Sequence, residues 1–324
     1  MEENTEQRLD LTLFSEKIQE LKERIASIVV GQEQTVDLVL TAILANGHVL
    51  IEGVPGVAKT LLARLTARLI DADFSRVQFT PDLMPSDVLG TTVFNMKTNG
   101  FDFHQGPIFA DIVLVDEINR APAKTQAALF EVMEERQISI DGTTHRMGDL
   151  YTILATQNPV EQEGTYKLPE AQLDRFLMKI TMDYPSLEEE VNILERHHTN
   201  AALVKLDDIT PAITKEELLS LRAFMNQVFV DRTLLQYIAL IVQQTRTSKA
   251  VYLGASPRAS VAMLQSSKAY ALLQGRDFVT PEDIKFVAPY VLQHRLILTA
   301  EAEMEGYSPV KVTQRLIDKV EVPK

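Results

Sequence analysis

Two pairs of neighbouring residues have the types and the spacing that phosphate chemistry needs. Lys59 and Thr60 end the segment G-V-P-G-V-A-K-T, and Asp116 and Glu117 follow the apolar segment I-V-L-V further along the chain. A lysine at the end of such a loop can reach the β- and γ-phosphates of a nucleotide, and the threonine hydroxyl can hold Mg²⁺. Asp116 suits a contact to Mg²⁺, and Glu117 suits orienting and deprotonating a water aimed at the γ-phosphate.

The segment before Lys59 has the layout of a phosphate-binding loop. Residues 49–51 (V-L-I) predict a buried strand, glycines and a proline then end it, and residues 61–70 predict a helix. Glycines let backbone N–H groups turn toward an anion, and the helix N-terminus adds the positive end of its dipole. An ordinary turn that happens to carry Lys and Thr is disfavoured, because the strand, loop and helix signals follow in the required order.

One position departs from the usual pattern of this loop. Gly normally precedes the lysine, but the residue here is Ala58. We expect a position that enters a right-handed helix to accept Ala, so the substitution should not disable the loop.

We expect a bound nucleotide to contact the loop and the residues that flank it. These residues are Gly53, Val54, Pro55, Gly56, Val57, Ala58, Lys59, Thr60 and Leu61. An earlier turn, V-V-G-Q, separates two predicted helices and contains Val30 and Gly31. This turn either lines an adenine pocket or simply joins the two helices, and the sequence favours neither interpretation.

The acidic pair and one asparagine follow predicted strands directly. Residues 112–115 form the most apolar strand candidate, and a continuous apolar run is typical of a buried parallel strand. Open α/β sheets bind ligands at the carboxyl ends of their strands, where Asp116 and Glu117 stand. Asn158 follows the apolar strand 151–155 and could hydrogen-bond the attacking water or a γ-phosphate oxygen. The alternatives are a helix N-cap for the acids and a loop-starting Asn-Pro for Asn158.

The remaining pattern predicts an α/β region followed by helices. Further short strands are expected at 77–79 and 177–181, a helix at 119–135, and two hairpins at 91–105 and 137–147. Asn99 with Gly100, and Asp141 with Gly142, are the turn signals of these hairpins. The leucines at 62, 65 and 69 share one helix face, which should lie on the sheet.

The pattern changes after Pro185. We expect an α/β core over residues 1–186, a connecting helix and linker over 187–212, and a helical domain over 213–324. Thr280 should cap a helix that begins with Pro281. A short strand is expected at 310–312.

Composition excludes several classes of protein. The chain has 324 residues, of which 45% are hydrophobic and 24% charged, as in globular proteins, and it has no Cys for disulfides, thiolate catalysis or metal thiolates. No apolar run approaches the ~18 residues of a membrane span, and the polar start M-E-E-N-T-E-Q is no secretory signal. We therefore expect a cytoplasmic protein. The net charge of −13 argues against a broad nucleic-acid-binding surface.

Five segments in order carry a resemblance to a known family: G-V-P-G-V-A-K-T, I-V-L-V-D-E-I-N-R, A-T-Q-N-P, L-P-E-A-Q-L-D-R-F and G-A-S-P-R-A. The set resembles the MoxR family of AAA+ ATPases, over about residues 13–295, and Ala before the lysine is usual in that family. The resemblance implies a P-loop core, with a parallel five-stranded sheet, helices on both faces and hairpin inserts, followed by an all-α lid. It also implies ATP and Mg²⁺ as ligands.

The resemblance assigns roles to individual residues. It implies that Lys59 and Thr60 are the Walker A pair, that Asp116 and Glu117 are the Walker B pair, and that Asn158 is the first sensor. Arg175, in L-D-R-F, matches the arginine finger that enters the neighbouring subunit's site.

Arg258, in G-A-S-P-R-A, matches the second sensor. The local sequence also places Arg258 in the first turn of a helix, after Ser256 as cap and Pro257 as first residue. A cation there opposes the helix dipole, and a bound phosphate would remove that conflict. The alternatives are an exposed Arg258 and an Arg175 that pairs with its neighbour Asp174, while Arg120 is a rival for the arginine that acts between subunits.

The family implies an ATP-driven remodeller of protein partners. Its members are thought to assemble as hexameric rings and to act on partners with von Willebrand factor A domains, in their maturation or metal loading. A nucleic-acid motor and a chelatase-type subunit share this core and remain alternatives, as does a scaffold that binds nucleotide without turnover. The hairpins argue against the motor, because residues 91–105 contain one Lys and residues 137–147 one Arg.

Overall fold

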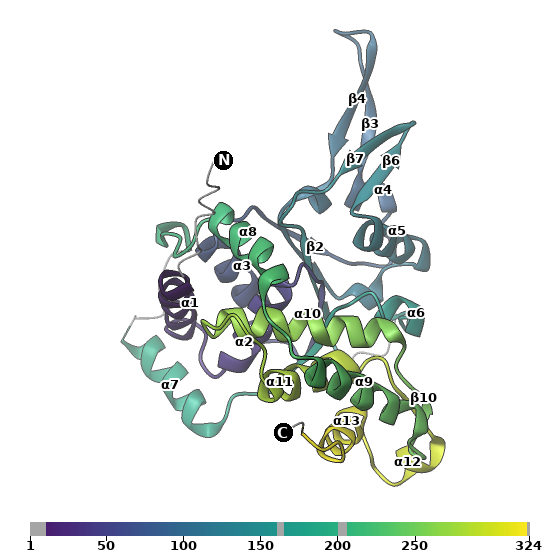
Figure 1. Ribbon diagram of the computed structural model, residues 1–324. Coiled ribbons are helices and arrows are strands. Elements are labelled where there is room, and N and C mark those ends of the chain that lie inside the picture. Colours follow the sequence, from purple (N-terminus) through teal and green to yellow (C-terminus); the bar gives the residue numbers. More distant parts are fainter. Residues whose placement is uncertain (1–10, 161–164, 200–205, 323–324) are drawn as a thin grey trace, which may run out of the picture.

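A parallel sheet forms the centre of the computed structural model, which describes residues 11–160, 165–199 and 206–322 (Figure 1). Its five strands lie in the order β2-β5-β8-β1-β9, and every neighbouring pair is parallel. The strands are β1 (Val49–Gly53), β2 (Phe74–Gln78), β5 (Ile112–Asp116), β8 (Thr152–Gln157) and β9 (Met178–Met182). The predicted five-stranded parallel sheet is therefore confirmed, although β2 begins three residues before the apolar segment that predicted it.

Helices cover both faces of this sheet. Ile112 and Leu114 of β5 belong to one hydrophobic cluster, and the residues that alternate with them belong to another, because successive side chains of a strand point to opposite faces. The first cluster includes α2 (Glu33–Leu44) and α3 (Lys59–Leu69), whose three leucines are buried as predicted. The second cluster includes α5 (Ala123–Glu135).

The helix expected at 119–135 is shorter in the structure. Ile118–Arg120 forms a single 3₁₀ turn, and α5 begins only at Ala123. Pro122 stands before it with ψ near 151°, an extended conformation that cannot continue a helix from the preceding turn. Glu117 and Arg120 therefore lie on a separate turn rather than on α5.

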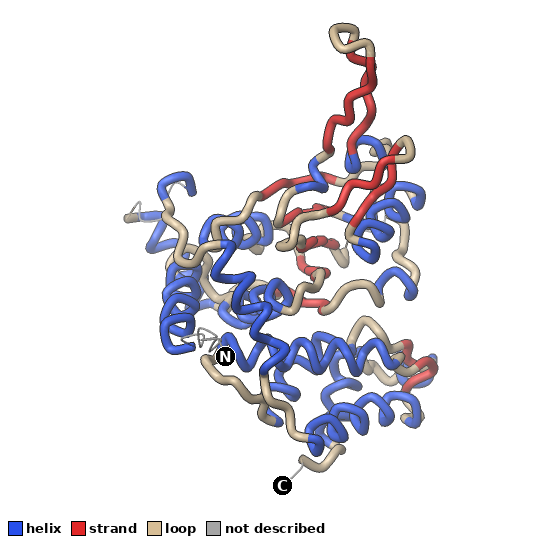
Figure 2. The backbone as a smooth tube through the Cα atoms, turned by 45° about the horizontal axis from the view of Figure 1, so that its top comes forward, coloured by secondary structure: helices blue, strands red, loops and turns tan. Residues whose placement is uncertain are grey.

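Two antiparallel hairpins project together from the core, as both views of the backbone show (Figures 1 and 2). Their strands are β3 (Gly90–Asn95), β4 (Gly100–Gln105), β6 (Gln137–Ile140) and β7 (Thr143–Arg146). Asn99 has φ of 51°, and Asp141 and Gly142 have φ of 50° and 79°. Both predicted turns are confirmed, since tight hairpin turns require such positive φ values.

The core has three further helices and a 3₁₀ turn. Helix α1 (Leu11–Ala26) opens the described chain, α4 (Pro85–Leu89) and the 3₁₀ turn Pro107–Phe109 stand on either side of the first hairpin, and the short α6 (Glu170–Leu173) precedes β9.

The second half of the chain is mostly helical. It comprises α7 (Leu187–His198), a 3₁₀ turn (Leu206–Asp208), α8 (Lys215–Phe224), a 3₁₀ turn (Met225–Gln227), α9 (Arg232–Thr247), α10 (Pro257–Leu273), α11 (Pro281–Leu292), α12 (Ala300–Met304) and α13 (Pro309–Asp318). The predicted cap of α11 is confirmed, because Thr280 and Asp283 each bond the other's backbone N–H.

One sequence-based expectation is wrong in this half of the chain. The strand expected at 310–312 is part of α13, which Ser308 caps and Pro309 begins. The lid is helical as predicted, with one small antiparallel ribbon formed by Val251–Leu253 (β10) and Ile297–Leu298 (β11).

The lid packs directly against the core. Helix α10 lies beside α2, α11 lies beside β9, and the largest hydrophobic cluster includes residues of both regions. The domain limits predicted at 186 and 212 stay predictions. Residues 200–205 of the expected linker, like the N-terminal segment M-E-E-N-T-E-Q, lie outside the described residues.

Candidate nucleotide-binding site and a separate arginine cluster

A cavity of about 260 Å³ opens at the carboxyl ends of β1, β5 and β8. We call it the carboxyl-edge cavity, and its lining includes Lys59, Thr60, Asp116, Glu117, Thr156 and Asn158. The structure thus brings five residues predicted from separate parts of the sequence into one place, because parallel strands deliver their carboxyl ends to the same edge of a sheet. Their roles toward a nucleotide stay predictions.

The loop before α3 is curled by residues with left-handed backbones. Gly56 has φ of 91°, which only glycine adopts freely, and Ala58 has φ of 63° and ψ of 22°. The expectation that Ala58 accepts Ala because it enters a right-handed helix is therefore wrong. Ala58 is the left-handed residue immediately before the helix, and its side chain there costs on the order of 1 kcal/mol relative to glycine.

The ammonium group of Lys59 folds back onto its own loop. Its Nζ donates a hydrogen bond to the carbonyl oxygen of Gly53. Burial lowers the pKa of Lys59, and the nearby charges of Asp116 and Glu117 act in the opposite direction. The two acids therefore favour a charged lysine at the position where a β- or γ-phosphate would sit.

Asp116 is buried, and each of its two carboxylate oxygens accepts a hydrogen bond. The Thr156 hydroxyl donates to its Oδ1 at 3.1 Å, and Arg76 Nε donates to its Oδ2 at 2.6 Å. Mg²⁺ prefers hard oxygen ligands and usually keeps several waters beside one or two protein groups. The Thr60 hydroxyl and the Asp116 carboxylate in this cavity fit such a site, with Arg76 as the cation that now balances Asp116.

Glu117 has a strained backbone conformation, and its side chain lines the carboxyl-edge cavity. Its φ is 56°, and its backbone N–H donates to the Thr156 hydroxyl at 3.0 Å. Its Oε2 accepts a hydrogen bond from Gln78 at 2.7 Å and lies 3.3 Å from Arg120 Nε. Left-handed backbone at a non-glycine residue costs about 1–3 kcal/mol and persists only where the surroundings impose it. The turn after β5 therefore points this carboxylate into the cavity instead of into a helix cap.

Sequence reasoning missed three residues of the cavity. Arg76 and Gln78 come from β2, and Thr156 comes from β8. The Thr156 hydroxyl links the two acidic residues, because it accepts a hydrogen bond from the Glu117 backbone N–H and donates one to the Asp116 carboxylate. The signal that could have found them is positional, since polar residues at the carboxyl ends of strands beside β5 must face the same edge.

Asn158 lines the cavity as predicted, whereas the turn that contains Val30 and Gly31 does not. The Asn158 side-chain oxygen accepts a hydrogen bond from the Val160 N–H at 3.2 Å. A Cβ at Gly31 would lie 2.5 Å from the carboxyl group of Glu189 in α7, so that turn packs against α7, and its contact with adenine stays a prediction.

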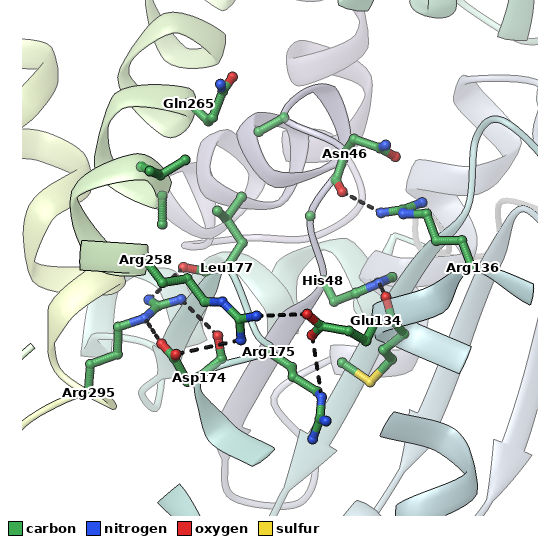
Figure 3. A pocket seen from close by; sticks show the side chains of 15 residues that line it. Asn46, His48, Glu134, Arg136, Asp174, Arg175, Leu177, Arg258, Gln265 and Arg295 are labelled. Carbon is green, nitrogen blue, oxygen red and sulfur yellow. Dashed lines mark hydrogen bonds and ion pairs between the residues drawn. The ribbon is translucent and has the colours of Figure 1, made fainter. Parts of the chain in front are cut away.

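The structure does not bring Arg175 or Arg258 to the carboxyl-edge cavity. Both line a second cavity of about 280 Å³, the amino-edge cavity, together with Gly47 and His48, which precede β1 (Figure 3). Strand β1 has five residues, so the two cavities are separated by roughly 16 Å of extended chain. Neither arginine therefore lines the carboxyl-edge cavity of its own chain.

The surroundings of both arginines differ from the sequence expectations. Arg258 stands in the first turn of α10 as predicted, but the Ser256 side chain makes no capping bond. Arg258 Nη2 bonds Glu134 Oε1 at 2.7 Å while 51% of its side chain stays exposed, and no residue of the phosphate loop lines its cavity. Arg175 Nε lies 3.4 Å from Glu134 Oε2, whereas Asp174 pairs with Arg295.

Two histidines beneath the amino-edge cavity are buried and neutral. His48 Nδ1 accepts from the Ile153 N–H, which places its proton on Nε2, where it bonds the Met133 carbonyl. Burial, together with the charge of Arg136, lowers the pKa of His48 to about 3. Burial also lowers the pKa of His294, whose Nε2 lies 3.1 Å from the carbonyl oxygen of Phe176.

Comparisons with known proteins agree with this architecture. Residues 48–178 match the model of the ATPase family associated with various cellular activities (AAA), and residues 243–318 match the AAA lid domain. Fold and site thus define an AAA-type ATPase core with its lid.

Relatives from several bacteria match nearly the whole chain. The chain is 44% identical to Chaperone MoxR1 of Mycobacterium tuberculosis over 93% of this chain and 81% of that protein. It is 47% identical to the protein YeaC of Bacillus subtilis over 93% of each. A crystal structure from Cytophaga hutchinsonii, of a protein assigned as an ATPase, superimposes with a TM-score of 0.88 and 40% identity, covering 97% of each chain. The chain belongs to the MoxR family of AAA+ ATPases.

The described residues contain neither a membrane span nor a cluster of metal-binding side chains. None of the helices in the part of the chain that the structure describes is long and apolar enough to cross a membrane. Across the same described residues, no group of three or more His, Cys, Asp or Glu side chains is arranged to hold a metal ion.

Proposed function

We propose that the chain hydrolyses ATP at sites that are completed by a second copy of itself. The observation that carries this proposal is the separation described above. Lysine, acids and asparagine meet at the carboxyl edge, whereas Arg175 and Arg258 lie beyond the amino end of β1. Phosphoryl transfer needs positive charge at the γ-phosphate, and a head-to-tail contact between copies would supply it.

Within one chain, each residue of the carboxyl-edge cavity has a distinct task. Backbone N–H groups of the loop and Lys59 would hold the phosphates, and Thr60 and Asp116 would hold Mg²⁺, which supplies charge neutralisation between the β- and γ-phosphates. Glu117 would accept a proton from the attacking water, and Asn158 would orient that water. Thr156 keeps the two acids in a fixed relation through its hydroxyl.

Arg175 is the better candidate for the arginine that acts between subunits. Its rival, Arg120, lies 3.3 Å from Glu117 of its own chain and therefore belongs to the cis site. Arg175 shares its cavity with Arg258 of the lid, so two guanidinium groups can face one neighbour. A contact of this kind repeats from subunit to subunit until a ring closes, and a hexamer is the size that the family suggests.

Mixing two inactive variants tests the shared site. Glu117→Gln subunits retain their arginines but cannot activate water, and Arg175→Ala subunits retain an intact carboxyl-edge cavity. In a random one-to-one mixture, roughly a quarter of the interfaces would join an intact cavity to an intact arginine, so about that share of the wild-type rate should return. A mixture that stays inactive, although the two variants co-assemble, would show that Arg175 does not act across the interface.

We propose a protein as the client of this ATPase, with a von Willebrand factor A domain as the class that the family suggests. The first hairpin supports a protein client, because it exposes Val93, Phe94, Met96 and Phe101, which are 46–88% accessible. Exposed apolar side chains that gather on one element mark a surface for protein contact. Nucleic acid is a poorer client, since Lys97 is the single basic residue on this hairpin.

Affinity capture tests the identity of the client. Glu117→Gln should remain in its ATP-bound state and retain partners that the wild type releases. We expect a protein with a von Willebrand factor A domain among them, and Phe101→Ser in the same background should lose it. Recovery of nucleic acid instead, released by salt, would contradict the proposal.

A further inference from the structure

Five charged side chains of alternating sign run along the amino-edge cavity (Figure 3). Their order is Arg175, Glu134, Arg258, Asp174 and Arg295. The two oxygens of Glu134 are divided between two arginines, with Oε2 at 3.4 Å from Arg175 Nε and Oε1 at 2.7 Å from Arg258 Nη2. Asp174 is divided in the same way, at 3.7 Å from Arg258 Nη1 and 2.6 Å from Arg295 Nε.

These side chains come from both halves of the molecule. Glu134 is in the last turn of α5, and Asp174 and Arg175 lie between α6 and β9, all in the core. Arg258 is in the first turn of the lid helix α10, and Arg295 follows α11. Glu134 therefore links an arginine of the core to an arginine of the lid.

One end of this series is anchored. The Arg295 side chain is only 3% exposed, and besides Asp174 it bonds the carbonyl oxygens of Phe176 and Leu177. Arg295 thus fixes the segment that carries Asp174 and Arg175 against the lid. The other end is open, because the side chains of Arg175 and Arg258 are 31% and 51% exposed.

Arg175 is supported in a way that leaves its terminal nitrogens available. Its guanidinium carbon lies 5.9 Å from the centre of the Phe130 ring, and only its Nε faces Glu134. Over the described residues, no hydrogen bond from the terminal nitrogens of Arg175 to a protein acceptor is found. These two nitrogens form the planar fork that suits two oxygens of a phosphate.

We propose that Glu134 is a positioning residue that holds Arg175 and Arg258 as a pair, so that core and lid present both guanidinium groups together to the neighbouring subunit's phosphates. This inference rests on the proposed function of Arg175. Two nearby guanidinium groups repel each other, and a carboxylate with one oxygen toward each removes that repulsion and sets their spacing. A movement of the lid would then change both contacts at once.

Stability alone is a poor explanation for this arrangement. Partly exposed ion pairs contribute little to folding, because water screens them and the side chains lose freedom. Glu135 is the adjacent carboxylate at the same helix end, and it makes no ion pair within the described residues. It therefore serves as the matched control.

Complementation between variants tests the inference. Glu134→Gln keeps the size of the side chain but loses its charge, and we expect its kcat to fall about tenfold to a hundredfold, with KM for ATP and thermal stability nearly unchanged. A one-to-one mixture of Glu134→Gln with Glu117→Gln should recover activity, because the Glu134→Gln subunits still have an intact carboxyl-edge cavity. Glu135→Gln should behave as wild type on its own. Glu134→Ala, analysed in the same way, should lose more activity and be complemented equally.

A parallel mixture of Arg175→Ala with Glu117→Gln separates the two proposals. If this mixture recovers activity and the Glu134→Gln mixture does not, Glu134 does not act through the interface arginines, and the inference is wrong. If the Arg175→Ala mixture recovers no activity, the proposal of a shared site is wrong, and the proposed role of Glu134 is wrong as well. Wild-type kcat in Glu134→Gln would also overturn the inference.

Discussion

The two cavities of this chain are built from similar groups but in opposite ways. At the carboxyl edge, strained backbone at Ala58 and Glu117 directs side chains into an open space that suits a nucleotide. At the amino edge, three arginines are paired with two carboxylates, and two other residues of the lining, Asn46 and Arg136, have left-handed backbone. The carboxyl-edge cavity thus suits a nucleotide bound by its own chain. The amino-edge cavity suits contact with a nucleotide bound by a neighbouring copy.

This difference is the basis of the proposal that two copies share each ATPase site. We propose that the lysine, acid and hydroxyl groups at the carboxyl edge bind a triphosphate and orient water. Arg175 and Arg258, which we propose to act on the phosphates of a neighbouring copy, lie beyond the other end of β1. Within one copy they pair with Glu134 and Asp174.

The largest expected effect comes from the amino edge. Arg175→Ala should lower kcat by about 10³–10⁵, because an arginine supplied from a neighbour is worth that much in related phosphoryl transfers. Nucleotide affinity should be almost unchanged, since Arg175 does not line its own nucleotide cavity. Steady-state hydrolysis and titration with a fluorescent ATP analogue measure the two quantities, with Arg64→Ala on α3 as an exposed-arginine control. Equal losses in binding and in turnover would place Arg175 in the cis site.

A smaller loss is expected at the carboxyl edge. Glu117→Gln should lower kcat by about 10²–10⁴, the usual contribution of a general base, while ATP still binds. Its amide can keep the hydrogen bond with Gln78 but cannot take a proton. Single-turnover hydrolysis measures the chemical step directly, with Glu131→Gln on α5 as the control. An unchanged rate would remove Glu117 from the mechanism.

Acid should lower the stability of the folded chain through its two buried histidines. The folded pKa values of His48 and His294 lie below the ordinary 6.5, so below that pH the unfolded chain binds protons that the folded chain does not. Stability is therefore complete above pH 6.5 and falls as the pH decreases toward 3, by up to about 1.4 kcal/mol per pH unit for each histidine.

Denaturant unfolding between pH 7.5 and 5 measures this effect. At pH 5 the neutral His48, with its pKa of about 3, should cost about 2 kcal/mol of unfolding free energy relative to neutral pH, and His294 should lower that free energy further. His48→Gln should remove its share of the pH dependence, whereas His104→Gln, an exposed residue of β4, should leave it as it is. A pH dependence that is the same in His48→Gln and wild type would contradict a buried, neutral His48.

The smallest expected effect concerns the strained loop. Ala58→Gly should raise the free energy of unfolding by roughly 0.5–1 kcal/mol, because glycine adopts the left-handed conformation without steric cost. Ala63→Gly, in the right-handed interior of α3, should lower it by about 1 kcal/mol. Thermal or denaturant unfolding of the two variants measures these values, and destabilisation by Ala58→Gly would refute the strain at this position.

Much of this architecture could be predicted from the sequence because its signals are local. Apolar runs marked the five strands, and glycines with Lys59 marked the phosphate loop. Turn residues such as Asp141 marked the hairpins. Each of these signals depends on a few adjacent residues, and the comparisons place the whole chain in the family that the motifs indicate.

The errors arose where distant contacts decide the structure. Edge strand β2 carries Arg76 and Gln78, whose polarity hid both the start of the strand and its part in the cavity. The alternation V-K-V at 310–312 suggested a strand, although burial of Val312, Leu316 and Ile317 makes it a helix. The position of Arg258 depends on how the lid packs, and no local pattern carries that information.

The dependence of specific activity on protein concentration tests the shared site most directly. ATP hydrolysis per subunit is measured across the concentrations over which the chain assembles, with mass photometry on the same samples. The shared site predicts that single chains bind ATP yet hydrolyse it at a small fraction of the assembled rate. Full activity per subunit in samples that contain only single chains would contradict it.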